Sequence, residues 1–142
     1  MMSASKLRLY WRLQLAAHYL QKNADRELLA KAYITTAQTG VMAAITNGKN
    51  ITQKNIADRL GLNESAVTAM VRRLVALGYI ERRQSQNDGR AKLLTLTPLG
   101  KDVQANVRPP FRKINNRIEN TLSEEEIENL AEYLERLTES FK

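Results

Sequence analysis

The sequence predicts a mainly α-helical fold with one small β-hairpin, and three observations support this. Apolar residues recur at helical spacing along most of the 142 residues. Two short helical segments are separated only by Gly61-Leu62-Asn63, a helix stop followed at once by a new cap. The period then changes to that of two strands on either side of Asp88-Gly89. Together these features predict a winged helix-turn-helix over residues 35–100, inside a single domain 1–142.

The first predicted helix covers residues 7–32, where Leu7, Trp11 and Leu15 recur every four residues. The C-terminal part carries a second set of apolar residues at helical spacing: Phe111, Ile114, Ile118, Ile127, Leu130, Leu134, Leu137 and Phe141. This is more apolar surface than a small winged helix alone has to cover. We therefore expect residues 1–33 and 101–142 to form the interface of a homodimer, with an intramolecular helix bundle as the alternative.

The second and third predicted helices have clear starts. Thr35 is placed to cap the second helix, and Gln38 stands three residues later, as in a capping box. Thr52 is placed to cap the third helix, and Gly61 stands where a left-handed residue ends it. These two helices precede the proposed turn.

After the hairpin, the positions of prolines and a serine predict where helices begin and where one is interrupted. Pro98 follows Thr97 and suits the first position of a fifth helix. Pro109-Pro110 must interrupt or kink that helix, because each proline lacks an N–H and crowds the preceding turn. A final helix is expected from Ser123, with Glu126 completing a capping box.

The composition excludes several classes of function. The chain has no Cys and a single His, His18, which leaves little for disulfides, thiol chemistry, a metal cluster or a His-dependent catalytic triad. No apolar run is long enough to span a membrane, and no secretory signal is visible. A soluble cytoplasmic protein without cofactor, metal or enzymatic activity is expected. The net charge of +7, with an acidic segment 123–142, indicates an anionic partner for the remainder.

The fourth predicted helix, from about Glu64 to Leu77, has the pattern of a DNA recognition helix. At 100° per residue, Val67, Val71 and Leu74 lie on one side. Small, polar and cationic residues lie on the other: Ser65, Thr68, Ala69, Arg72 and Arg73. Small residues let a helix enter a major groove, where Arg can bind guanine and hydroxyls can reach phosphates or base edges. The alternative is a merely solvated helix face.

The predicted strands, 79–84 and 92–97, form a hairpin with a polar, basic tip. Arg90 at this tip suits a narrow minor groove, where the negative potential is strongest. Asp88 either orients Arg90 or simply makes the turn. Further candidate phosphate contacts come from the strands and from the start of the third helix: Arg82, Arg83, Lys92, Thr52, Gln53 and Lys54.

These residues resemble the multiple antibiotic resistance regulator (MarR) family of bacterial transcription factors. The most specific match is Asp88-Gly89-Arg90 followed by residues 94–100, Leu-Thr-Leu-Thr-Pro-Leu-Gly. The resemblance implies a homodimeric regulator that acts as a repressor, with one winged helix per subunit on a pseudo-palindromic operator. It implies that Ser65, Thr68, Arg72 and Arg73 read the major groove and Arg90 the minor groove.

The resemblance also implies that a small aromatic ligand releases the DNA. Tyr10, Trp11, Arg12 and His18 on the first helix are candidates to line such a site, although Tyr10 and Trp11 also suit a core and His18 an ordinary half-buried position. The absence of Cys argues against a thiol-oxidation switch. The alternative function is a winged-helix module whose basic face binds an acidic protein.

Overall fold

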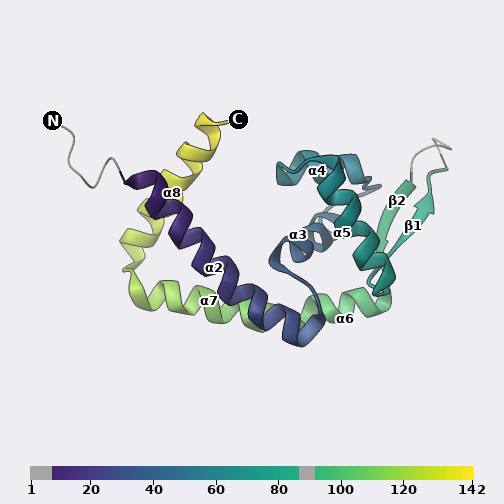
Figure 1. The fold of residues 1–142 in the computed structure, drawn as a ribbon, viewed down its shortest axis with the longest axis horizontal. Coiled ribbons are helices and arrows are strands. Elements are labelled where there is room, and N and C mark those ends of the chain that lie inside the picture. The colour runs from purple at the N-terminus through teal and green to yellow at the C-terminus, as the bar shows by residue number, and fades with distance from the viewer. Residues whose placement is uncertain (1–7, 87–91) are drawn as a thin grey trace. The chain divides into compact units, whose positions relative to one another are not determined.

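The chain divides into two units of structure. The computed structural model describes residues 8–86 and 92–142; the first unit extends through Arg108 and the second is Pro109–Lys142. The first unit contains, in chain order, α2 (Leu9–Ala32), α3 (Thr36–Thr46), α4 (Gln53–Leu60), α5 (Glu64–Ala76), β1 (Ile80–Gln84), β2 (Lys92–Leu96) and α6 (Pro98–Asn106) (Figure 1). The second unit consists mainly of two helices, α7 (Arg108–Thr121), which begins at the last residue of the first unit, and α8 (Glu124–Ser140).

The predicted caps are confirmed. The side chains of Thr35, Thr52 and Ser123 each accept from the backbone N–H three residues later, and the reciprocal bonds complete three capping boxes. Gly61 ends α4 with a φ of 65°. The Asn63 side chain accepts from the Ala66 N–H and starts α5. The helix-turn-helix is therefore set by local hydrogen bonds.

The core of the first unit is formed by α3, α4 and α5, which pack on one another, and by the C-terminal half of α2, which packs on α3. Its fully buried side chains come from five elements and the linkers between them, and include Leu28, Ile34, Val41, Met42, Ile56, Val67, Val71, Leu74 and Ile80. Residues 9–20 of α2 are exposed throughout, so only its second half contributes to this core. Tyr79 is also buried, and its hydroxyl donates to the Ala32 carbonyl oxygen at the end of α2, at 2.8 Å.

The hairpin packs onto the helix-turn-helix by its base. β1 and β2 pair antiparallel, with Ile80 opposite Leu96 and Arg82 opposite Leu94. The backbone N–H of Leu94 donates to the Ile51 carbonyl oxygen at 2.8 Å, which ties β2 to the segment before α4. Each strand is one residue shorter than predicted, at Tyr79 and at Thr97. Thr97 instead caps α6 through the Gly100 N–H.

The predicted interruption at Pro109-Pro110 is confirmed, and its form is now clear. α6 ends at Asn106, and α7 begins at Arg108, so both prolines lie in the first turn of α7. The N–H groups of a first turn have no partner within the helix, so proline removes no intrahelical hydrogen bond there. The prolines therefore begin a new helix.

Within residues 8–86 and 92–142, no helix is long and apolar enough to cross a membrane. The same part of the chain holds no group of three or more His, Cys, Asp or Glu side chains that could bind a metal ion.

Candidate nucleic-acid interface

The outward face of α5 matches the pattern predicted from the sequence. Val67, Val71 and Leu74 are fully buried. The opposite stripe is exposed at Ser65, Ala69, Arg72 and Arg73 and partly exposed at Thr68. One helix therefore presents small polar side chains near its start and two guanidinium groups near its end.

Within residues 8–86 and 92–142, no acidic side chain neutralises the cations of this face. No hydrogen bond or ion pair joins the side chains of Arg72 or Arg73 to any other described residue. The only acidic side chain of α5 is Glu64, at its first residue. The positive end of the stripe is thus free to bind an anion such as a phosphate or the acceptor edge of guanine.

The start of α4 lies against α5. Gln53, the first residue of α4, is partly exposed, and its Nε2 donates to the Thr68 hydroxyl at 3.0 Å. Lys54 beside it is exposed, whereas the hydroxyl of Thr52 is used within the cap, where it contacts Asn55. The structure thus brings Gln53 and Thr68 together, although they are 15 residues apart.

The hairpin places two predicted phosphate contacts on one face. Directly opposed residues of antiparallel strands point to the same side, so Arg82 shares a face with Leu94, and Lys92 with Gln84. Alternation puts both pairs on the side of the buried Ile80. Arg83 lies on the other face, where it pairs with Glu81 at 2.7 Å. Arg82 and Lys92 are therefore the better candidates. Arg90, the predicted minor-groove residue, and Asp88, predicted to orient Arg90 or to make the turn, lie outside the described residues.

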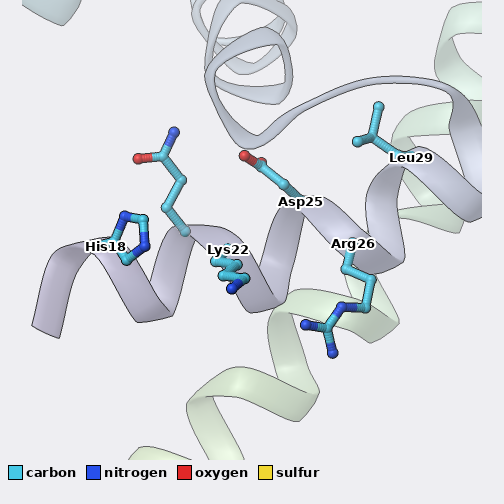
Figure 2. Close-up of a pocket in the computed structure, with 6 residues that line it drawn as sticks. His18, Lys22, Asp25, Arg26 and Leu29 are labelled. Atoms are coloured by element: carbon cyan, nitrogen blue, oxygen red, sulfur yellow. The ribbon is translucent and has the colours of Figure 1, made fainter. Parts of the chain in front are cut away.

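A second candidate site is a hollow of about 450 Å³ along α2. It is lined by side chains that recur at helical spacing, namely His18, Gln21, Lys22, Asp25, Arg26 and Leu29 (Figure 2). Of the predicted ligand residues, His18 lies in this lining, whereas Tyr10, Trp11 and Arg12 do not. Tyr10 and Trp11 form an exposed edge-to-face pair, with ring centroids 5.0 Å apart.

Several residues of these sites were not predicted, because His18 is the only lining residue of the hollow that the sequence analysis named. Two of the others make further contacts. Asp25 lines the hollow, and its carboxylate also accepts from the backbone N–H of Thr36, the first residue of α3, at 2.7 Å. Asn63 was expected only to cap α5, but its Oδ1 accepts from the Ser65 hydroxyl as well. The contact between Asp25 and Thr36 had only a weak signal in the sequence. It consisted of an acidic residue late in one predicted helix and a threonine early in the next.

Comparisons with known proteins agree with this geometry. The model of the MarR family matches residues 34–91. The chain is 29% identical over 118 residues to the HTH-type transcriptional regulator BilQ of Clostridioides difficile, covering 81% of this chain and 80% of that protein. It is 35% identical over 86 residues to the multiple antibiotic resistance protein MarR of Escherichia coli, covering 58% of this chain and 60% of that protein.

Solved structures share the fold over nearly the whole chain. A MarR mutant from E. coli complexed with operator DNA has a TM-score of 0.76 at 25% identity, covering 92% of this chain and 96% of that one. The PcaV regulator of Streptomyces coelicolor, in complex with its natural ligand, has a TM-score of 0.81 at 23% identity and complete coverage of both chains.

The fold and the exposed basic face of α5 thus define a winged helix-turn-helix transcriptional regulator. More particularly, residues 34–91 match the MarR family, and the chain is similar to the multiple antibiotic resistance protein MarR of E. coli over 86 residues. This is a family of transcription regulators and not of enzymes.

Proposed function

We propose that this chain acts as a homodimeric repressor that binds a pseudo-palindromic operator and is released by a small anionic ligand. In each subunit α5 enters a major groove, and the wing, with Arg90, reaches the adjacent minor groove. A two-fold dimer would place its two recognition helices one DNA turn apart, about 34 Å.

The observation that carries the proposal is the outward face of α5. Ser65, Ala69, Arg72 and Arg73 are exposed, and the two arginines have no acidic partner among the described residues. The MarR structure named above contains operator DNA. An acidic protein surface is the alternative partner for such a face, and it offers no major-groove base edges to read.

Apolar side chains outside the core support the dimer. On α2, Tyr10 is 62% exposed and Trp11 is 69% exposed. In the second unit α8 has no buried residue, although Leu130, Tyr133, Leu134 and Leu137 recur along one face. Surfaces of this kind on a transcription regulator favour association with a second copy.

The hollow along α2 supports the effector. It is an open hollow of about 450 Å³ along one helix, lined mostly by polar and charged side chains. Lys22, Arg26 and His18 favour an anion. The Asp25 carboxylate accepts a hydrogen bond from the backbone N–H of Thr36 at the start of α3. A ligand that displaces Asp25 would loosen the contact between α2 and the DNA-binding helices. PcaV, which shares the fold, was solved with its natural ligand.

The test is a gel-shift and fluorescence-anisotropy titration with duplex DNA from the gene's own promoter region. A discrete complex of one dimer per site supports the proposal, and a thermal-shift screen of aromatic carboxylates then tests the effector. The absence of any complex at low salt, where phosphate contacts are strongest, would contradict DNA binding. A complex with one monomer per site would contradict the dimer.

A further inference from the structure

The hydroxyl hydrogens on the outward face of α5 are already used within the protein. A serine or threonine hydroxyl has one hydrogen to donate and two lone pairs to accept with. Which of these remain available decides what the side chain can recognise. The contacts of Thr68 and Ser65 answer this question.

Thr68 donates its hydrogen to its own helix. Its Oγ1 lies 2.8 Å from the Glu64 carbonyl oxygen, and a carbonyl oxygen can only accept. Gln53 must therefore present its amino group to Thr68, since the hydroxyl has no second hydrogen for the amide oxygen. That contact, Nε2 to Oγ1 at 3.0 Å, occupies one lone pair. A single acceptor lone pair of Thr68 remains.

The Ser65 hydroxyl likewise donates its only hydrogen within the protein. Its Oγ lies 2.9 Å from Asn63 Oδ1, the atom that also accepts from the Ala66 backbone N–H at 2.9 Å. The cap thus identifies this atom as the oxygen, and Ser65 must donate to it. Both hydroxyls of the face consequently offer only acceptors.

We infer that Thr68 and Ser65 are specificity-determining residues that accept hydrogen bonds from exocyclic amino groups of the bases and do not bind the phosphate backbone. Phosphate oxygens accept hydrogen bonds and cannot donate them. In the major groove the donors are the N6 amino group of adenine and the N4 amino group of cytosine. Contacts to phosphates are then left to cationic residues such as Lys54 and Arg82, which donate. The inference rests on the proposed function.

Gln53 acts as a positioning residue in this arrangement. Its amino group, fixed by the start of α4, holds the Thr68 hydroxyl and selects which lone pair faces outward. Gln53→Met keeps the length of the side chain and removes this donor. We expect it to relax the base preference at the position that Thr68 reads.

The experiment selects preferred duplexes from a random library with the full-length protein. Anisotropy titrations then compare the wild type and Thr68→Val on the selected duplex and on a random duplex. Thr68→Val is expected to lose about tenfold in affinity on the selected duplex and almost nothing on the random one. Replacing one adenine of the site by purine, or one cytosine by 2-pyrimidinone, removes a single amino group. One such duplex should weaken the wild type about tenfold and leave Thr68→Val unaffected.

Thr46→Val is a matched control. The Thr46 hydroxyl also donates to its own helix, at Met42, and accepts from a glutamine of a neighbouring helix, Gln104 Nε2 at 2.9 Å. It lies on α3, outside the predicted interface, and should leave both affinities unchanged. An equal loss on both duplexes by Thr68→Val would show a phosphate contact and overturn the inference while DNA binding stands. A library in which no duplex is enriched would overturn the proposed function itself.

Discussion

At Gly100, neighbouring backbone atoms leave no room for a side chain. A Cβ on Gly100 would collide with the carbonyl oxygen of Tyr79 and would lie 2.9 Å from its carbonyl carbon and 3.2 Å from its Cα. These are backbone atoms, and the Tyr79 carbonyl is held by the Thr97 N–H at 3.0 Å. Gly100→Ala must therefore move α6 away from the junction between α5 and β1.

The cost follows from this displacement. Forced overpacking and one weakened hydrogen bond together lower the free energy of unfolding by about 2–4 kcal/mol. This corresponds to a fall in Tm of roughly 5 to 15 °C. Urea denaturation and a thermal melt of the purified variant measure both quantities.

Gly40→Ala is the control for the same substitution. Gly40 lies inside α3, and a Cβ there would meet only the Leu60 Cδ1 atom, at 3.9 Å. Alanine should raise stability at Gly40 by about 0.5–1 kcal/mol, because glycine is a poor helix former. If both variants melt at the same temperature, the close approach of α6 to Tyr79 is wrong.

Three further predictions concern the helix starts and the dimer. Asp25→Ala removes the acceptor for the Thr36 N–H and should lower the free energy of unfolding by about 1–2 kcal/mol in urea denaturation. Asp25→Asn keeps an oxygen at this place and should lower it less. Equal losses in the two variants would argue against the hydrogen bond. The Ser123 N–H holds the pKa of Glu126 below its ordinary 4.5, so this cap stabilises α8 at higher pH and is lost as the pH falls through the lowered value. NMR titration of the Glu126 carboxyl checks this, and a midpoint at or above 4.5 would contradict it. Leu134→Glu places a charge among apolar residues of α8 and should weaken the dimer about 100-fold or more, as measured by light scattering. Glu135→Gln is the neutral control. A Leu134→Glu dimer that stays intact at nanomolar concentration would refute that interface.

Local features of the fold were predictable from the sequence. A cap and its partner lie three residues apart, so the boxes beginning at Thr35 and Ser123 and the cap at Thr52 follow from residue type and spacing alone. The reciprocal bond from the Thr52 N–H to Asn55 was not predicted. The inward and outward faces of α5 follow from helical periodicity in the same way.

Contacts between elements were not predictable, because they depend on how helices pack. The Gln53–Thr68 hydrogen bond spans 15 residues and the Tyr79–Ala32 bond spans 47. The sequence therefore named Thr68 as a DNA contact without showing that its hydrogen is already used. Likewise Trp11 stands two helical turns before His18 on α2, yet the hollow begins only at His18.

The most direct test of the central claim, DNA recognition by α5, is the salt dependence of binding to promoter DNA. Anisotropy titrations at increasing salt compare the wild type with Arg72→Ala, Arg73→Ala and, as control, Arg117→Ala, another exposed arginine. The wild type should show a steep linear fall of log K with log salt concentration. Each α5 variant should lose about tenfold or more in affinity by losing either a guanine contact or a phosphate contact, and only the latter should reduce the slope by about one per site. Unchanged affinity and slope in both α5 variants would contradict the placement of α5 in the major groove.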